Sequence, residues 1–137
     1  ATVAPSPYTE ALLAQDETRA VALAAEMDGQ AVYAQGKLAL VHWMRRHTDE
    51  LAADGIRINA VAPGFTRTPL TEAGLSNPEY GPMIERFLQS IPLKREAQPA
   101  EIASVACFLL RREASYVSGA VLYVDGGYDA TTRPDAC

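Results

Sequence analysis

Two hydrophobic periods alternate along the chain, one typical of helices and one typical of buried strands. Residues 9–27 are mostly Ala, Leu, Glu, Gln and Arg, which favour helix, and they predict a solvent-facing helix or a helical hairpin. Asp28-Gly29-Gln30 is predicted to be a turn, after which a helix opens at Tyr33 and ends at Asp54-Gly55. One stripe of that helix carries Leu40, Trp43, Met44, His47 and Leu51.

Short apolar runs predict the strands. Residues 56–61 have enough apolar character for a strand that is buried on both faces, and residues 120–124 predict another strand. Residues 1–4 are expected to be the end of an earlier strand. A helix of about twenty residues between two strands is a crossover connection, which makes the strands parallel. We therefore predict an α/β fold built on a parallel sheet.

Two connecting segments are candidates for ligand binding. Pro63-Gly64 breaks a strand at its carboxyl end, where ligands bind in open parallel sheets. Residues 65–68 follow with two hydroxyls and free backbone groups, which suit an amide or a phosphate, or make a plain β-to-α loop. Residues 69–93 are predicted to be irregular, with a helical piece at 83–88, and to act as a lid or to pack against the domain. The apolar face of this segment comprises Leu75, Tyr80, Met83, Ile84 and Phe87.

The C-terminal third contains a well-marked helix start. Pro99 suits the first position of a helix and Glu101 its first turn. Cys107 lies in the apolar run of this helix and is predicted to be a core residue. Its buried stripe comprises Ile102, Val105, Ala106 and Leu109. Asp125-Gly126-Gly127 predicts a turn that needs positive φ, and residues 128–137 are predicted to be a polar tail.

Composition narrows the class of protein. The chain has 137 residues, a net charge of −5 and 48% hydrophobic residues, which suits one globular domain and disfavours a nucleic-acid binder. No apolar run approaches the roughly 20 residues that span a bilayer, and no signal peptide is evident. Two cysteines far apart favour a reducing, cytoplasmic setting. His42 and His47 are five residues apart with no third ligand nearby, so no metal site is expected.

Tyr33 and Lys37 are the candidates for chemistry. Residues four apart on a helix lie on one face, with Cβ atoms about 5–6 Å apart. At a separation of ~4.5 Å and a dielectric of ~20, the ammonium would favour the phenolate by roughly 4 kcal/mol. That would bring the tyrosine pKa from about 10 close to the working pH, which suits the proton transfer of a carbonyl–alcohol interconversion. The alternative is a half-buried tyrosine beside a solvated lysine.

Four features in order resemble the C-terminal half of the short-chain dehydrogenase/reductase family. They are Tyr33-x-x-x-Lys37, residues 57–68 with Pro63-Gly64, Ser118-Gly119 with its strand, and Val124-Asp125-Gly126-Gly127. The insertion ahead of Tyr33, residues 73–81 and the ending at 125–134 are most similar to the bacterial 3α-hydroxysteroid dehydrogenase/carbonyl reductase type. The resemblance implies the C-terminal part of a Rossmann-like, doubly wound parallel sheet. Residues 1–137 would be a single partial domain, with a helical insertion at about 9–28 and a substrate loop at about 69–93.

The resemblance also implies roles. Tyr33 would be the catalytic acid/base, Lys37 would lower its pKa and bind the nicotinamide ribose, and Thr2 would stand at the catalytic serine, with a stiffer χ1. The nicotinamide half of NAD or NADP, with NAD slightly favoured, would contact Tyr33, Lys37, Pro63, Gly64, Phe65, Thr66 and Thr68. The substrate would be a small apolar alcohol or ketone such as a hydroxysteroid. The helix from Pro99 and the strand from Ala120 would form the surface of a homodimer or larger homo-oligomer.

Parts of the family pattern have no counterpart in these 137 residues. The glycine-rich turn that seats the pyrophosphate, and the residue that selects NAD over NADP, belong to the preceding half of the family fold. A second hypothesis is therefore kept: a truncated, catalytically inactive homologue that acts as a structural or dimerisation module.

Overall fold

The computed structural model describes residues 4–135, which divide into two compact units. One unit runs up to Ala60 and includes Ser118–Ala120. The other comprises Val61–Val117 and the chain from Val121 on. No helix in the described range is long and apolar enough to cross a membrane.

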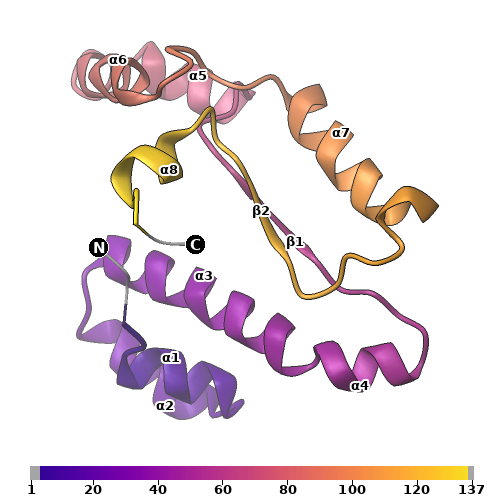
Figure 1. The fold of residues 1–137 in the computed structure, drawn as a ribbon. Coiled ribbons are helices and arrows are strands. Elements are labelled where there is room, and N and C mark those ends of the chain that lie inside the picture. The colour runs from indigo at the N-terminus through magenta and orange to yellow at the C-terminus, as the bar shows by residue number, and fades with distance from the viewer. Residues whose placement is uncertain (1–3, 136–137) are drawn as a thin grey trace. The chain divides into compact units, whose positions relative to one another are not determined.

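The first unit is helical (Figure 1). Its elements are α1 (Pro7–Leu13), α2 (Glu17–Ala25), α3 (Gly29–Arg46) and α4 (Thr48–Ala53). The side chains of Ser6, Asp16 and Asp28 cap α1, α2 and α3 by accepting backbone N–H groups of the first turn. The cap at Asp16 starts a new helix, so residues 9–27 form the hairpin rather than one helix. The turn predicted at residues 28–30 is wrong, because Asp28 caps a helix that already includes Gly29 and Gln30.

Helix α1 packs against both α2 and α3. Small buried side chains, Ala11 on α1, Ala20 on α2 and Ala39 on α3, let these helices approach closely. The stripe predicted for α3 is only partly correct, because Met44 is buried whereas Leu40 is 57% exposed. A polar face of α3 points toward α1 in its place, through Gln35. Gly55 ends the helical region at φ +73°, as its position after the helix predicts.

A parallel pair of strands follows, β1 (Ala60–Pro63) and β2 (Val121–Val124). The backbone N–H of Ala60 donates to the Ala120 carbonyl and that of Gly64 to the Val124 carbonyl, both at 2.9 Å. The α/β class and the parallel pairing are therefore confirmed. Strand β1 starts four residues later than predicted and its residues are only partly buried, because β2 is its only partner strand in the described residues.

Residues 69–93 are more regular than predicted. They form α5 (Pro69–Leu75) and α6 (Gly81–Ser90), which pack against each other. Pro69 and Pro82 lie in the first turns of these helices, where no N–H donor is needed, whereas Pro78 and Pro92 lie outside them. Of the predicted apolar face, Tyr80 and Met83 are exposed.

The remaining elements are α7 (Pro99–Leu110), η1 (Arg112–Ala114) and α8 (Tyr128–Thr132). Leu109 of α7 is buried, as predicted, but Cys107 is exposed. The core assignment of Cys107 was wrong because α7 is apolar on several faces and Cys107 lies on an outer one, near the exposed Phe108 and Leu110. The predicted polar tail is also partly wrong, since residues 128–132 are helical.

Candidate functional site

Tyr33 and Lys37 lie on one face of α3, as their spacing predicts. The Lys37 Nζ is 5.5 Å from the centroid of the Tyr33 ring, a cation–π distance. Tyr33 is 66% exposed. Within residues 4–135, neither the Tyr33 hydroxyl nor the Lys37 ammonium has a hydrogen-bond or ion-pair partner. Both polar groups are therefore available to a ligand.

The loop after β1 contains the second group of candidate residues. The Thr66 hydroxyl donates to the Gly64 carbonyl at 3.0 Å. Ala97 joins this loop from the far end of the α5–α6 segment: its N–H donates to the Phe65 carbonyl at 2.9 Å, and its carbonyl accepts from Arg67 N–H at 2.8 Å. The free backbone groups predicted for residues 65–68 are thus largely paired, because the two ends of the segment meet there in a parallel bridge.

Thr68 has a structural role that follows from its position. Its side chain caps α5 by accepting from the Thr71 N–H, and Thr71 Oγ1 accepts from the Thr68 N–H at 2.8 Å, which completes a capping box. The Thr71 hydroxyl also donates to the Thr66 carbonyl at 2.8 Å. Thr71 was not predicted, although a threonine before a proline and three residues ahead of a second hydroxyl is a recognisable helix start.

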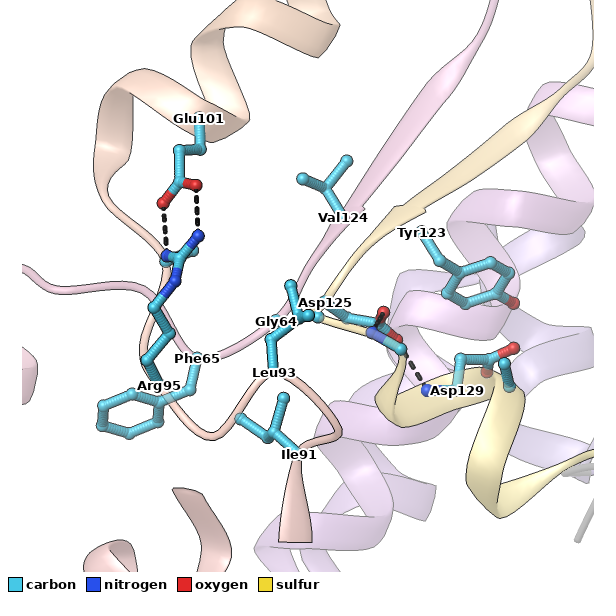
Figure 2. A pocket seen from close by; sticks show the side chains of 14 residues that line it. Gly64, Phe65, Ile91, Leu93, Arg95, Glu101, Tyr123, Val124, Asp125 and Asp129 are labelled. Carbon is cyan, nitrogen blue, oxygen red and sulfur yellow. Dashed lines mark hydrogen bonds and ion pairs between the residues drawn. The ribbon is translucent and has the colours of Figure 1, made fainter. Parts of the chain in front are cut away.

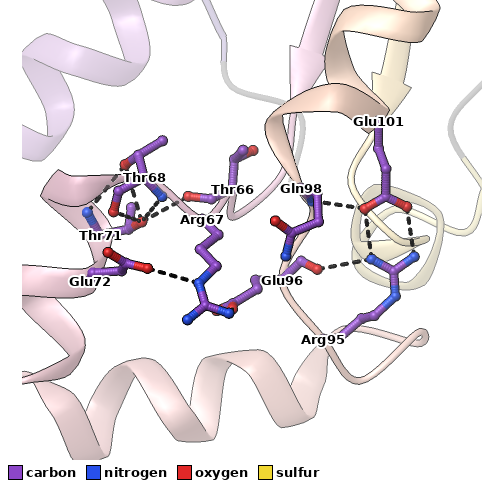
Figure 3. Close-up of polar contacts among 9 residues, drawn as sticks. All are labelled: Thr66, Arg67, Thr68, Thr71, Glu72, Arg95, Glu96, Gln98 and Glu101. Carbon is purple, nitrogen blue, oxygen red and sulfur yellow. Dashed lines mark hydrogen bonds and ion pairs between the residues drawn. The ribbon is translucent and has the colours of Figure 1, made fainter.

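Ion pairs reinforce the same region (Figure 3). Arg67 binds Glu72 of α5 at 2.8 Å and Glu96 at 3.5 Å, which links the two ends of the α5–α6 segment. Arg95 and Glu101 form a two-bond pair at 2.8 and 2.7 Å. The Arg95 guanidinium, followed by the Gln98 backbone N–H, lowers the pKa of Glu101 from 4.5 to about 2.

A cavity of about 390 Å³ lies beside the loop (Figure 2). Phe65, Ile91, Leu93 and Val124 supply apolar lining, and Arg95, Glu101, Asp125 and Asp129 supply charged lining. A Cβ on Gly64 would stand 2.6 Å from the Asp125 Cα, so only glycine allows the two strand ends to approach this closely. The Asp125-Gly126-Gly127 turn is confirmed, with φ +67° at Gly126 and +90° at Gly127.

The predicted site residues therefore fall into two groups. Tyr33 and Lys37 lie together in the first unit, and Pro63, Gly64, Phe65, Thr66 and Thr68 lie in one stretch of the second. Thr2 lies outside the described residues. His47 stacks on Trp43 and bonds its carbonyl at 2.8 Å. The described part of the chain contains no group of three or more His, Cys, Asp or Glu that could hold a metal ion.

The chain is similar to proteins of known family. A family model described as enoyl-(acyl carrier protein) reductase matches residues 17–129. The 3-alpha-hydroxysteroid dehydrogenase/carbonyl reductase of Comamonas testosteroni is 43% identical over 132 residues, which cover 94% of this chain and 51% of that protein.

Solved structures give the same result. The 3-alpha-hydroxysteroid dehydrogenase from Pseudomonas sp. B-0831, complexed with NADH, matches with a TM-score of 0.85 and 42% identity over 96% of this chain and 51% of its own. YwfH, an NADPH-dependent reductase involved in bacilysin biosynthesis, matches with a TM-score of 0.60 and 31% identity over 66% of this chain and 37% of its own. The chain spans about half the length of the first two relatives. The matched range contains all four sequence features, and the chain belongs to the short-chain dehydrogenase/reductase family, as the C-terminal part of its Rossmann-like fold.

Proposed function

We propose that this chain carries the proton-transfer and nicotinamide-side part of an NAD(P)-dependent oxidoreductase that interconverts a secondary alcohol and a ketone. The observation that carries the proposal is the Tyr33–Lys37 pair, with the ammonium over the ring and with both polar groups lacking other partners in residues 4–135. A phenol beside a cation can exchange a proton with a substrate oxygen.

Each residue of the pair has a distinct role. Tyr33 donates its phenolic proton to the carbonyl oxygen during reduction and takes it back during oxidation. Lys37 stabilises the phenolate by charge, and its three N–H donors can bind ribose hydroxyls. Thr2 would orient the substrate oxygen through its hydroxyl. A bound nicotinamide would supply or accept the hydride.

The loop from Pro63 to Thr68 would hold the nicotinamide half. Its internal pairing keeps it in one conformation, which reduces the ordering cost of binding. The Thr66 hydroxyl donates to Gly64 and retains lone pairs that can accept from a carboxamide N–H. One relative is described with NADH and another as NADPH-dependent, so both cofactors stay open, with NAD slightly favoured.

The substrate would be apolar, and a hydroxysteroid is the specific candidate. Leu70, Tyr80 and Met83 expose apolar surface on α5, α6 and the turn between them, which suits a substrate loop. The relatives named for 3-alpha-hydroxysteroids support the same substrate class. We propose a reducing, cytoplasmic setting for this activity.

The test is Tyr33→Phe, made in the polypeptide as its own cell produces it. Loss of the hydroxyl should abolish turnover while NADH binding, followed by fluorescence, stays within a few-fold of the parent. Tyr116→Phe, at a fully exposed tyrosine, is the matched control and should keep full activity. Unchanged turnover in Tyr33→Phe would overturn the assignment.

A second function, a dimerising module without catalysis, is favoured by α7. Its outer face exposes Cys107 and Phe108, and Leu110 is 83% exposed, although all three are apolar. We propose that a second copy of the chain covers this face. Leu110→Glu should then shift the sedimentation coefficient toward that of the monomer. Saturable submillimolar NADH binding together with turnover would exclude a purely structural role.

A further inference from the structure

Gln35 stands between Tyr33 and Lys37 and connects their helix to the segment that leads into α1. Its Nε2 donates to the Ala4 carbonyl at 3.1 Å, and its Oε1 accepts from the Ser6 N–H, also at 3.1 Å. The same Oε1 accepts from the Thr9 hydroxyl. One amide therefore holds three residues that lie 26 to 31 positions away in sequence. All of these residues belong to the first unit.

Thr9 shows that this contact is well packed. Its side chain is fully buried, and it is the only buried polar residue in the described range. Its hydroxyl also approaches the Gln35 backbone carbonyl at 3.4 Å. A buried hydroxyl is costly without a partner, and Gln35 supplies the closest partner of the Thr9 hydroxyl, beside a longer contact with the Ser6 hydroxyl at 3.5 Å.

The helix geometry makes the contact relevant to the site. An α-helix has 3.6 residues per turn, so Gln35 projects about 200° around the axis from both Tyr33 and Lys37. The Tyr33 ring is mostly exposed, and within the described range its hydroxyl has no partner. The orientation of Tyr33 and Lys37 therefore depends on how α3 is held on its opposite face. Packing brings α1 and α3 together, and Ala11 and Ala39 are buried, but apolar contacts are not directional, whereas hydrogen bonds are.

We propose that Gln35 is a positioning residue for the Tyr33–Lys37 pair. Its amide fixes the rotation of α3 against residues 4–9 and thereby sets the direction in which the phenol and the ammonium point. In this proposal, residues 4–9, which lead into the α1–α2 hairpin, help to orient the catalytic side chains. This proposal rests on the proposed function. The variants below distinguish a failure of the positioning role from a failure of the proposed function.

The first test replaces Gln35 by residues that remove parts of the contact. Gln35→Met keeps the length and removes every hydrogen bond of the side chain. Gln35→Glu keeps the acceptors but removes the donor to the Ala4 carbonyl. Gln30→Met is the matched control, because Gln30 lies in the same helix with an exposed side chain.

We expect kcat of Gln35→Met to fall about 10- to 100-fold, the scale of a misplaced reacting group, with the KM for the cofactor changed less than threefold. Gln35→Glu should lose less, and Gln30→Met should match the parent. An unchanged kcat in a folded Gln35→Met protein would overturn the proposal. An equal loss in Gln30→Met would also overturn it, since any change in α3 would then suffice.

Thr9 provides the second variant, which keeps the proposal testable if Gln35→Met does not fold. Thr9→Val should lower kcat in the same way. Thr9→Ser, which keeps the hydroxyl, should have the kcat of the parent. In a double-mutant cycle, Thr9→Val and Gln35→Met should be non-additive in kcat, because both remove one contact. Full additivity would contradict the proposal.

The outcome separates this inference from the proposed function. An inactive Tyr33→Phe beside an unaffected Gln35→Met would overturn only the positioning role. A fully active Tyr33→Phe would overturn both.

Discussion

The Tyr33–Lys37 pair and the loop from Pro63 to Thr68 are the two groups of candidate site residues, and they differ in how far the fold explains them. Tyr33 is exposed, and within residues 4–135 neither polar group of the pair has a partner. The loop is the opposite case, since Gly64, Thr66 and Thr68 all make contacts that the fold itself needs.

This difference decides how strongly each motif indicates a catalytic or cofactor-binding role. The glycine at position 64 is required because Asp125 lies against it, so its presence says little about a cofactor. The hydroxyl of Thr68 is required as a helix cap. Nothing in the described structure requires a tyrosine at 33 or a lysine at 37, so these two residues are the stronger indication of chemistry.

The largest effect on stability is expected at Gly64. Gly64→Ala would place a Cβ 2.6 Å from backbone Cα of Asp125, and overpacking of this kind costs about 3 kcal/mol. Gly29→Ala is the control, because its Cβ would meet nothing within 4 Å. Urea denaturation of both variants checks the prediction. Equal stabilities would mean that the strand ends move apart freely. The fold would then require glycine at position 64 no more than it requires tyrosine at position 33.

The next effect is expected at Thr71. Thr71→Val removes the hydroxyl that accepts from the Thr68 N–H and donates to the Thr66 carbonyl, which should cost about 1–2 kcal/mol. Hydrogen exchange at the start of α5 should rise with it. Thr71→Ser keeps the hydroxyl and should behave like the parent. If Val and Ser variants exchange alike, the capping box does not hold the loop.

Local signals explain most of what could be predicted from the sequence. Gly55 after a helix, Pro99 with Glu101 at a helix start, and the glycines at 126 and 127 each act through their nearest neighbours. Those features were predicted correctly. The pairing of Tyr33 with Lys37 also follows from spacing alone.

Tertiary context explains the misses at Cys107 and Gln35, whereas the irregular structure predicted for residues 69–93 came from an overlooked local helix start. Pro69 both breaks regular structure and begins α5, and sequence alone favoured the wrong reading. Cys107 lies on a helix that is apolar on several faces, so periodicity could not decide which face is covered. Gln35 binds residues 26 to 31 positions away, for which no local pattern exists.

A smaller effect, an increase in stability, is expected in helix α3 beside the Tyr33–Lys37 pair. Gly36 lies between Gln35 and Lys37, and a Cβ there would meet nothing within 4 Å. Gly36→Ala should therefore stabilise the protein by about 0.5–1 kcal/mol, because alanine favours helix over glycine. Urea denaturation and NADH titration should be run together. Higher stability with unchanged NADH affinity is the expected result, and a loss of stability would contradict the open space seen around Gly36.

The smallest effect concerns Glu101 and is seen in the pH dependence of stability. The pKa of Glu101 is lowered from 4.5 to about 2, so its ionised form stabilises the folded state fully above about pH 4.5. That contribution is lost as the pH falls from about 4.5 through about 2. Glu101→Gln should therefore be less stable than the parent at pH 7, with a gap that closes over this range.

The Glu101 gap should be small and should shrink in added salt, because the pair with Arg95 is exposed. Glu113→Gln, at an exposed glutamate, is the control for the loss of one negative charge. If Glu113→Gln gives the same pH-dependent gap, net charge would explain the result. If only Glu101→Gln gives it, the second unit is held partly by a specific ion pair at the start of α7, whereas Gln35 holds α3 through uncharged hydrogen bonds of its half-buried amide.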